Sequence, residues 1–333
     1  MYSMQGVEVP YEEAEHKRNE LLEENILLTC YKPIKKESTI VFPVSEGTKG
    51  FRFERYKEKN TFQEEVVSFL TEEEKKVFIK SYDTIGDIAI VQIPTELIHK
   101  EKRIGEALLR VKPSLTCVRK RGEEHQGKYR TQNTVFLAGS NKTITTHTEN
   151  RTKLLVDVNN VYYSPRLATE RKRISELIEK DEDVLVLFDG CGPYSVTIAN
   201  NNASCMVTGV EWNEKGVMLA KKSSQKNNVK DRTQYIKSDV EDIQEDIGFF
   251  DRIVMPAPHN AEEYLHVLKS VTKKCSYVHL YTFVDNEEME KKGQRLKKSL
   301  STLFSSVSLT HHEVCGQKSP GVSRVCYDFS IRT

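Results

Sequence analysis

Residues 184–193 read Val184-Leu185-Val186-Leu187-Phe188-Asp189-Gly190-Cys191-Gly192-Pro193, an apolar strand that runs directly into a glycine turn. At the end of the first strand of a doubly wound sheet, such a turn lets the backbone approach a nucleotide-like cofactor, because glycine has no Cβ. A lone Gly-x-Gly is weak evidence, since many tight turns contain one. The segment therefore indicates a doubly wound sheet with a nucleotide-like cofactor site, an interpretation that other residues must support.

Acidic residues follow the next two predicted strands. Glu211 ends the segment 206–211, where a carboxylate can accept hydrogen bonds from the ribose hydroxyls of a nucleoside. Asp239 follows the segment 234–237, where it can accept a bond from an adenine amino group. Either acid alone is more often a helix cap or a surface residue. Three loops in this order favour S-adenosylmethionine over NAD, whose fingerprint is usually the fuller Gly-x-Gly-x-x-Gly.

From about residue 160 the chain alternates predicted strands and helices, a pattern typical of a mostly parallel sheet covered on both faces. Strands are expected at 184–188, 206–211, 234–237, 252–255, 276–281, 307–314 and 324–331, and helices at 166–180, 195–201, 213–227, 260–272 and 286–304. The last two strands can form an antiparallel edge. We predict an α/β fold in which a Rossmann-like domain that binds S-adenosylmethionine occupies 161–333.

Two smaller α+β domains are predicted upstream, at 1–75 and 76–160. The first combines a charged helix near 11–24 with strands at 26–31, 39–43 and 50–54. The second has a turn and a buried strand within 81–94, a helix at 98–111 that ends before a proline, and strands at 116–119, 134–137, 142–146 and 153–157.

Composition and charge narrow the class of protein. The 333 residues are 38% hydrophobic and 30% charged, as in globular rather than disordered chains. No apolar run is long enough to span a bilayer, no secretion signal is recognised, and the seven cysteines lack metal-type spacing. We therefore expect free thiols, no metal, no membrane partner and a cytoplasmic location.

One stretch is locally basic. Between Lys100 and Arg130, ten Lys or Arg stand against four Glu. Such a stretch in a neutral protein can bind phosphates, although a solvated charged face is the commoner interpretation. We expect its central residues, Arg119, Lys120 and Arg121, to contact nucleic acid.

Several segments together carry a family resemblance. They are Asp83-Thr84-Ile85-Gly86-Asp87-Ile88-Ala89, Gly127-Lys128-Tyr129-Arg130, Leu137-Ala138-Gly139, Thr146-His147-Thr148-Glu149-Asn150, Ser164-Pro165-Arg166-Leu167-Ala168-Thr169-Glu170-Arg171, the glycine turn, and Asp251-Arg252-Ile253-Val254-Met255. With them the chain resembles the archaeal–eukaryotic tRNA (guanine-37 N1) methyltransferase family over nearly its whole length. The run 164–171, with Gly-Lys-Tyr-Arg upstream, is specific to that family.

The resemblance implies methyl transfer from S-adenosylmethionine to N1 of guanosine 37, beside the tRNA anticodon, by a class I domain preceded by a middle domain and an N-terminal domain that checks the tRNA elbow. Glu170 matches the catalytic base that removes the N1 proton. Arg130 matches an arginine that contacts guanine O6, where negative charge accumulates. Arg166 lies four residues before Glu170, so the two can pair; without the resemblance, a surface salt bridge is the commoner interpretation.

Other site residues are expected with these. Tyr162 can stack on a base, although half-buried tyrosines are common, and Arg166 and Arg171 are expected at the tRNA. The expected cofactor-binding residues are Arg166, Phe188, Gly190, Gly192, Pro193, Glu211, Asp239 and Pro256.

Three positions depart from the family pattern. Pro256 stands where the family commonly has asparagine, and it offers neither a side-chain amide nor a backbone donor. His259 or Asn260 can supply the lost bond. Val186 replaces an acid at the end of the first strand, and Asp189 replaces a small residue in the glycine turn.

Other functions stay open. A related enzyme transfers the aminocarboxypropyl group of the same cofactor to a wyosine-type base at position 37, but its members usually lack the arginine found at Arg166. A non-catalytic tRNA-binding protein would keep the fold, and a dehydrogenase is a distant third. We expect a monomer, as in the family, because no long apolar heptad suggests a dimer.

Overall fold

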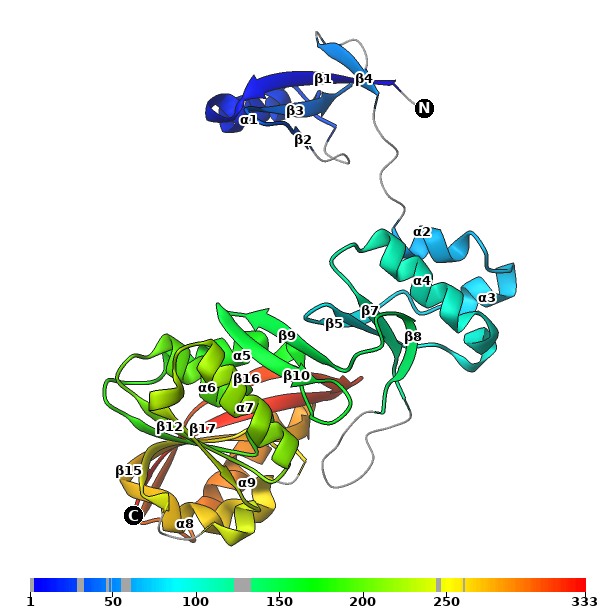
Figure 1. Cartoon of the computed structure of the whole chain (residues 1–333). Coiled ribbons are helices and arrows are strands. Elements are labelled where there is room, and N and C mark those ends of the chain that lie inside the picture. Colours follow the sequence, from blue (N-terminus) through cyan, green and yellow to red (C-terminus); the bar gives the residue numbers. More distant parts are fainter. Residues whose placement is uncertain are drawn as a thin grey trace. The chain divides into compact units, whose positions relative to one another are not determined.

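The computed structural model describes residues 3–28, 33–45, 48, 50–54, 61–122, 133–243, 247–259 and 261–333. The chain forms two compact units, Met1–Phe69 and Leu70–Thr333, each of which is described by itself (Figure 1). Arg130 and Asn260, both named from the sequence, lie outside the described residues. The boundary near residue 160 between a middle domain and a class I domain stays a prediction.

The first unit is built on an antiparallel sheet in the order β2-β3-β1-β4. Its elements are β1 Ser3–Pro10, a 3₁₀ helix Tyr11–Glu13, α1 Ala14–Glu23, β2 Ile34–Lys35, β3 Thr39–Val44, β4 Phe51–Glu54 and α2 Phe62–Val67. α1 packs on this sheet through Leu21, which is buried in a cluster with Val9 and Phe42. The predicted helix and the strands at 39–43 and 50–54 are confirmed.

Two details of this unit differ from the sequence prediction. β1 was missed, although Val7 and Val9 alternate with polar residues as in a half-buried strand. The strand expected at 26–31 is wrong over 26–28, where Leu27 makes only an isolated bridge to Val44. Residues 29–31 lie outside the described ranges.

The second unit begins with a four-stranded sheet in the order β5-β6-β7-β8. Its elements are α3 Glu72–Val77, β5 Tyr82–Ile85, β6 Ile88–Val91, a 3₁₀ helix Thr95–Lys100, α4 Glu101–Val111, β7 Cys117–Lys120 and β8 Val135–Gly139. β6 and β7 are parallel because α4 connects them, and α4 buries Ile104, Ala107 and Leu108 while packing on β7 and β8. The hairpin of β9 Ile144–Glu149 and β10 Thr152–Asp157 follows.

The rest of this unit is a seven-stranded sheet in the order β13-β12-β11-β14-β15-β17-β16. Its strands are β11 Asp183–Leu187, β12 Met206–Glu211, β13 Thr233–Lys237, β14 Phe250–Met255, β15 Thr272–Asp285, β16 Ser306–Ser319 and β17 Val322–Arg332. Its helices are α5 Ala168–Glu176, α6 Pro193–Asn201, α7 Glu214–Lys226, α8 Leu268–Val271 and α9 Met289–Leu300. Short 3₁₀ helices lie at Pro165–Leu167, Lys230–Arg232, Val240–Asp242, Ala261–Val267 and Asn286–Glu288.

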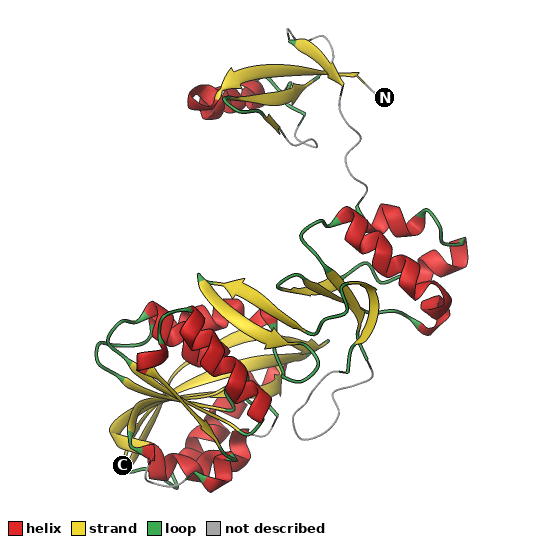
Figure 2. Cartoon of the chain, in the orientation of Figure 1, coloured by secondary structure: helices red, strands yellow, loops and turns green. Residues whose placement is uncertain are grey.

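The α/β prediction is confirmed: β11 to β15 run parallel, and β17 and β16 form the antiparallel edge. Helices α5 to α7 cover one face and α8 and α9 the other (Figures 1 and 2). The helix expected at 260–272 is wrong in detail, because a 3₁₀ helix and the short α8 occupy 261–271 and β15 begins at Thr272.

This topology decides where a ligand can bind. Strand order reverses beside β11, since β12 lies on one side of it and β14 on the other. Loops that follow parallel strands gather at their carboxyl edge, and the reversal opens a crevice between them. The glycine turn after β11 and the loops after β12, β13, β14 and β15 therefore share one edge. No described helix is long and apolar enough to cross a membrane.

Candidate cofactor and catalytic site

The glycine turn joins β11 to α6 through an unusual backbone conformation. Phe188, Gly190 and Gly192 have positive φ angles of 57°, 59° and 80°. Gly192 is the N-cap of α6, with Pro193 in the first turn, and a Cβ on Gly192 would lie 2.9 Å from the Cβ of Ala220. A side chain at Gly192 is thus disfavoured by both conformation and packing. A phenylalanine in the left-handed region is rare, and such strain gathers at functional loops.

Glu211 reaches back from the end of β12 to this turn. Its Oε2 accepts a hydrogen bond from the Gly190 amide at 2.8 Å, and its Oε1 accepts one from the Asn213 amide at 2.7 Å. Burial raises the pKa of the Glu211 carboxyl group. A carboxylate offers about four acceptor sites, so Glu211 can still accept bonds from ribose hydroxyls.

Asp239 follows β13 and accepts a bond from the Glu241 amide at 3.3 Å, which caps the 3₁₀ helix Val240–Asp242. The glycine turn, Glu211 and Asp239 follow three neighbouring strands at one edge of the sheet. The residues present therefore fit the ribose and adenine of S-adenosylmethionine.

The unusual residues of the first strand and its turn point into the protein. Val186 is fully buried. Asp189 is buried and accepts bonds from the amide and hydroxyl of Ser195, at 3.4 and 2.5 Å. Desolvation raises the pKa of Asp189 to about 8, with a smaller contribution from the charge of Glu211. Asp189 thus packs beneath the turn, while the ring of Phe188 lies edge-on to Tyr264 at 5.1 Å.

Glu170, the predicted base, is only 4% exposed. Its Oε1 accepts bonds from the Tyr281 hydroxyl at 2.5 Å and Arg173 Nη2 at 2.8 Å, and its Oε2 accepts one from Arg173 Nε at 2.8 Å. Arg166, which can pair with Glu170 or share the substrate by its spacing, instead pairs with Asp83, and Arg173 binds Glu170 from three residues later in the chain. The bonds to Glu170 fill three of about four acceptor sites, and the Cys315 side chain also hydrogen bonds to this carboxylate.

Two predicted tRNA-binding arginines are buried, which corrects the sequence prediction. Arg171 is 1% exposed and forms a two-pronged ion pair with Glu149, at 2.5 and 2.6 Å, which ties β9 to α5. Arg119 is 5% exposed and donates to the hydroxyl and carbonyl oxygens of Thr134 at 2.6 and 3.0 Å, and to Asn141 at 3.0 Å. Each guanidinium instead satisfies buried acceptors within the protein.

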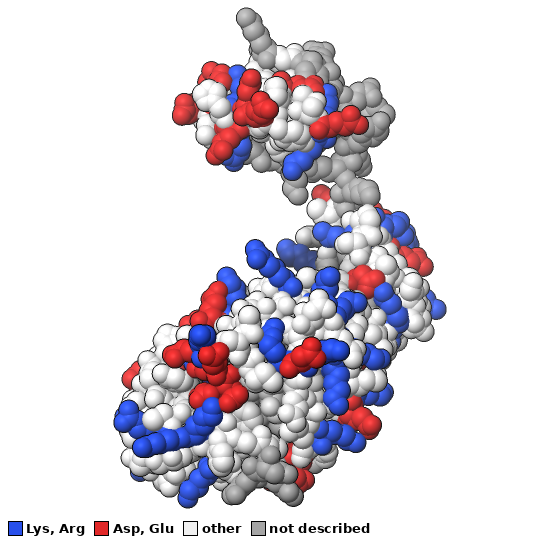
Figure 3. Space-filling model, turned by 60° about the vertical axis from the view of Figure 1, so that its left-hand side comes forward, with Lys and Arg blue, Asp and Glu red and all other residues white. Residues whose placement is uncertain are grey.

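The other basic residues that were predicted to bind tRNA are more exposed, but they are paired with acids. Arg166, with 73% of its side chain exposed, and Arg121 converge on Asp83 at 2.9 and 2.6 Å, and Lys120 pairs with Glu101. In Figure 3, Lys and Arg are spread over the visible face of the second unit and are interrupted by groups of Asp and Glu. Among described residues, the basic stretch is therefore more neutralised than its sequence suggests.

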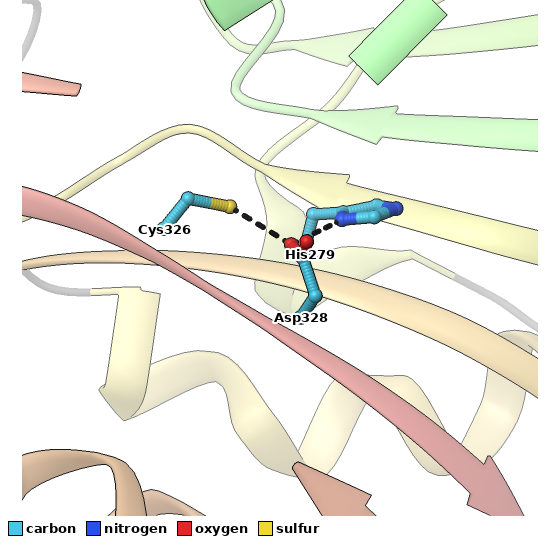
Figure 4. Close-up of side chains that lie close together, drawn as sticks. All are labelled: His279, Cys326 and Asp328. Atoms are coloured by element: carbon cyan, nitrogen blue, oxygen red, sulfur yellow. Dashed lines mark hydrogen bonds and ion pairs between the residues drawn. The ribbon is translucent and has the colours of Figure 1, made fainter. Parts of the chain in front are cut away.

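A buried polar network lies behind Glu170. Arg173 Nη1 donates to Asp328 at 2.7 Å, and Asp328 Oδ1 accepts a bond from His279 Nδ1 at 2.6 Å. Burial lowers the pKa of His279, and the neutral ring accepts at Nε2 from Arg252, 2.9 Å away. His279, Asp328 and Cys326 lie close together (Figure 4). Their bonds join them to one another and to two arginines, whose charges oppose a bound cation.

Several residues of this site were missed by the sequence analysis. Arg173 was recognisable, because it lies three residues after Glu170 in a predicted helix. Asp83 stands in a segment that was noted only for its family resemblance. Tyr281 and Arg324, which donates to the Tyr162 hydroxyl at 3.1 Å, come from β15 and β17. No local pattern links these strands to residues 162–170.

The fold and the glycine turn, Glu211 and Asp239 define a class I S-adenosylmethionine-dependent methyltransferase domain. The model of the TRM5/TYW2 methyltransferase domain matches residues 145–307, and that of the TYW2 N-terminal domain matches 63–143. The chain is 30% identical to the tRNA (guanine(37)-N(1))-methyltransferase Trm5b of Pyrococcus abyssi, over 98% of each chain. It belongs to the TRM5/TYW2 family.

The structure agrees with this membership. The crystal structure of wild-type Trm5b from Pyrococcus abyssi superimposes with a TM-score of 0.78, at 28% identity, over all of both chains. The chain is also 27% identical to a tRNA(Phe) (4-demethylwyosine(37)-C(7)) aminocarboxypropyltransferase of Pyrococcus horikoshii, over 79% of this chain and 93% of that one. The family thus includes both transfer reactions considered from the sequence.

Proposed function

We propose that this protein is a tRNA (guanine(37)-N1)-methyltransferase. The observation that carries the proposal is the buried carboxylate of Glu170, which Tyr281 and Arg173 hold in a fixed orientation. The similarity to Trm5b over nearly the whole chain supports the same reaction. S-adenosylmethionine supplies the methyl group when it is bound by the glycine turn, Glu211 and Asp239.

The residues of this chain would handle the proton and the charge of the target base. Guanine N1 carries a proton at neutral pH, and Glu170 Oε2 would accept it as the new bond to N1 forms. Negative charge then builds on guanine O6, where the proposed role of Arg130 is to stabilise it. Because Glu170 cannot rotate without breaking bonds to Tyr281 and Arg173, its orientation is set before the substrate arrives.

The partner and the location belong to the same proposal. The substrate would be a tRNA, with the anticodon loop at residues 162–170 and the elbow at the first unit. Arg166 and Arg121 both pair with Asp83 and would meet backbone phosphates. We propose a monomer that acts in the cytoplasm, in line with the free thiols at the six described cysteines.

The test is methyl transfer from labelled S-adenosylmethionine to unmodified tRNA carrying G37 or A37, with mass analysis of the product nucleoside. The proposal predicts a one-methyl increase at G37 only, and a loss of at least 100-fold in Glu170→Gln. Glu176→Gln, an exposed change on the same helix, is the matched control. A third tRNA, carrying 4-demethylwyosine at position 37, tests the other family reaction, which would add an aminocarboxypropyl group to it. Binding of tRNA without any product on G37 or A37 would leave a binding protein or the aminocarboxypropyl transferase.

A further inference from the structure

Phe283 and Arg324 lie on β15 and β17, two residues along these strands from Tyr281, which holds Glu170, and its pairing partner Cys326. Tyr281 of β15 pairs with Cys326 of β17, and Phe283 pairs with Arg324. Side chains two residues apart in a strand point to the same face, so Phe283 and Arg324 lie on the face where the Tyr281 hydroxyl meets Glu170. They also lie nearer the carboxyl end of β15, at the edge that carries the glycine turn.

Arg324 has unusual surroundings for a partly buried arginine. Its Nη2 donates to the Tyr162 hydroxyl at 3.1 Å, and its guanidinium carbon lies 5.3 Å from the centre of the Phe283 ring. Its Nε is buried and has no hydrogen-bond partner among the described residues. None of the ion pairs between described residues includes Arg324. A buried donor without a partner is uncommon in native structures and points to a missing acceptor.

The cluster lies beside the loop that lacks the family asparagine. The Phe283 amide donates to the Pro258 carbonyl at 3.2 Å, so Pro256–Pro258 runs alongside the end of β15. The His259 ring packs edge-on to Phe283 at 4.6 Å, and Lys318 Nζ lies 4.6 Å from the centre of the same ring. A proline at 256 cannot donate a bond to a base. Arg324 is a nearby side chain that can donate one.

We propose that Arg324 is a specificity-determining residue that donates to the O6 and N7 acceptors of the target guanine and so replaces the missing asparagine. The inference rests on the proposed function. Arginine with guanine O6 and N7 is the commonest specific contact between proteins and bases. Adenine presents an amino group where guanine has O6, so the same guanidinium disfavours A37. By bonding to the Tyr162 hydroxyl, Arg324 also orients a ring on which the base can stack.

The experiment compares wild-type protein with Arg324→Met and Arg324→Lys, on tRNA carrying G37 or 7-deazaguanosine 37, which lacks N7. We expect Arg324→Met to lower kcat/KM on G37 by roughly 10- to 100-fold, and Arg324→Lys to recover part of it. The 7-deazaguanosine substrate should lower kcat/KM of the wild type but cause little further decrease in kcat/KM of Arg324→Met. Affinity for S-adenosylmethionine should be unchanged in both variants. Arg332→Met, at the exposed far end of β17, is the control.

Three results would overturn the inference while leaving the proposed function intact. The first is wild-type activity in Arg324→Met. The second is a loss that multiplies with that of 7-deazaguanosine, because independent effects mean that Arg324 does not contact N7. The third is an equal loss of cofactor affinity, which would mean a structural role. If the wild type transfers no methyl group to G37, the proposed function fails and this inference fails with it.

Discussion

Asp189→Asn should change how the stability of the protein depends on pH. Desolvation raises the pKa of Asp189 from 3.8 to about 8, so between these values the folded protein holds a proton that the unfolded chain has lost. Stability therefore falls as pH rises, by about 1.4 kcal/mol per pH unit, until the pH passes the folded pKa. From pH 5 to pH 8 the ionisation of Asp189 in the unfolded chain should lower the free energy of unfolding by about 4 kcal/mol at most.

Asparagine keeps a neutral group of the same shape, and its amide can bond to the Ser195 hydroxyl. The variant should thus be more stable than the wild type at pH 8, by a margin that narrows towards pH 5. Denaturant unfolding at half-unit pH steps measures the difference. Asp181→Asn is the control, because Asp181 is mostly exposed and asparagine tolerates its positive φ of 62°. Parallel curves for Asp189→Asn and the wild type would refute the reasoning.

Three further changes test the site. Arg173→Met leaves the buried Asp328 without its guanidinium partner, so it should lower the free energy of unfolding by about 3 kcal/mol. It should also reduce methyl transfer more than Arg173→Lys does. Wild-type stability in Arg173→Met would contradict the proposed importance of the network. Gly192→Ala should lower the free energy of unfolding by about 1–3 kcal/mol and weaken cofactor binding, because φ is 80° and the new Cβ would clash with Ala220. Calorimetric titration with S-adenosylmethionine measures the change in binding. Glu211→Gln should weaken that binding roughly 10- to 100-fold. It should also lower thermal stability, because the new NH2 group replaces an oxygen that accepts a bond from the Gly190 or Asn213 amide. Unchanged affinity would remove Glu211 from the ribose site.

The sequence predicted the parts of the fold that depend on local patterns. Apolar runs such as Val184–Leu187, followed by glycine or by an acid, carry both the strand and its place in the sheet. The missed β1 had the same kind of pattern, but its alternation is short and contains a glycine. Element ends were the least certain, as in the segment 260–272, where a 3₁₀ helix replaces a regular one.

The site was predicted only where chemistry is local to a loop. Glu211 and the glycine turn follow their strands directly, so their meeting could be inferred. The burial of Arg119 and Arg171 could not, because an arginine in a charged run is usually exposed. Only the tertiary structure places Glu149 opposite Arg171, since 22 residues separate them. Exposure of basic residues was thus the weakest inference from the sequence.

The arginines near the site differ in how their charge is compensated. This difference distinguishes arginines that stabilise the fold from an arginine that can bind the substrate. Arg171 faces Glu149, Arg252 faces Glu182, and Arg173 is shared by two carboxylates. Buried charges need such partners, because an uncompensated ion in the interior is strongly destabilising.

Arg324 differs from these arginines, because among the described residues the only hydrogen bond of its guanidinium goes to a neutral tyrosine and it has no carboxylate partner. The interaction energy of such an arginine is most favourable when an electron-rich group binds beside it. A guanine whose O6 becomes negative as N1 loses its proton is such a group, and the attraction grows as the reaction proceeds. On this reasoning, Arg324 should contribute more to kcat than to the binding of tRNA.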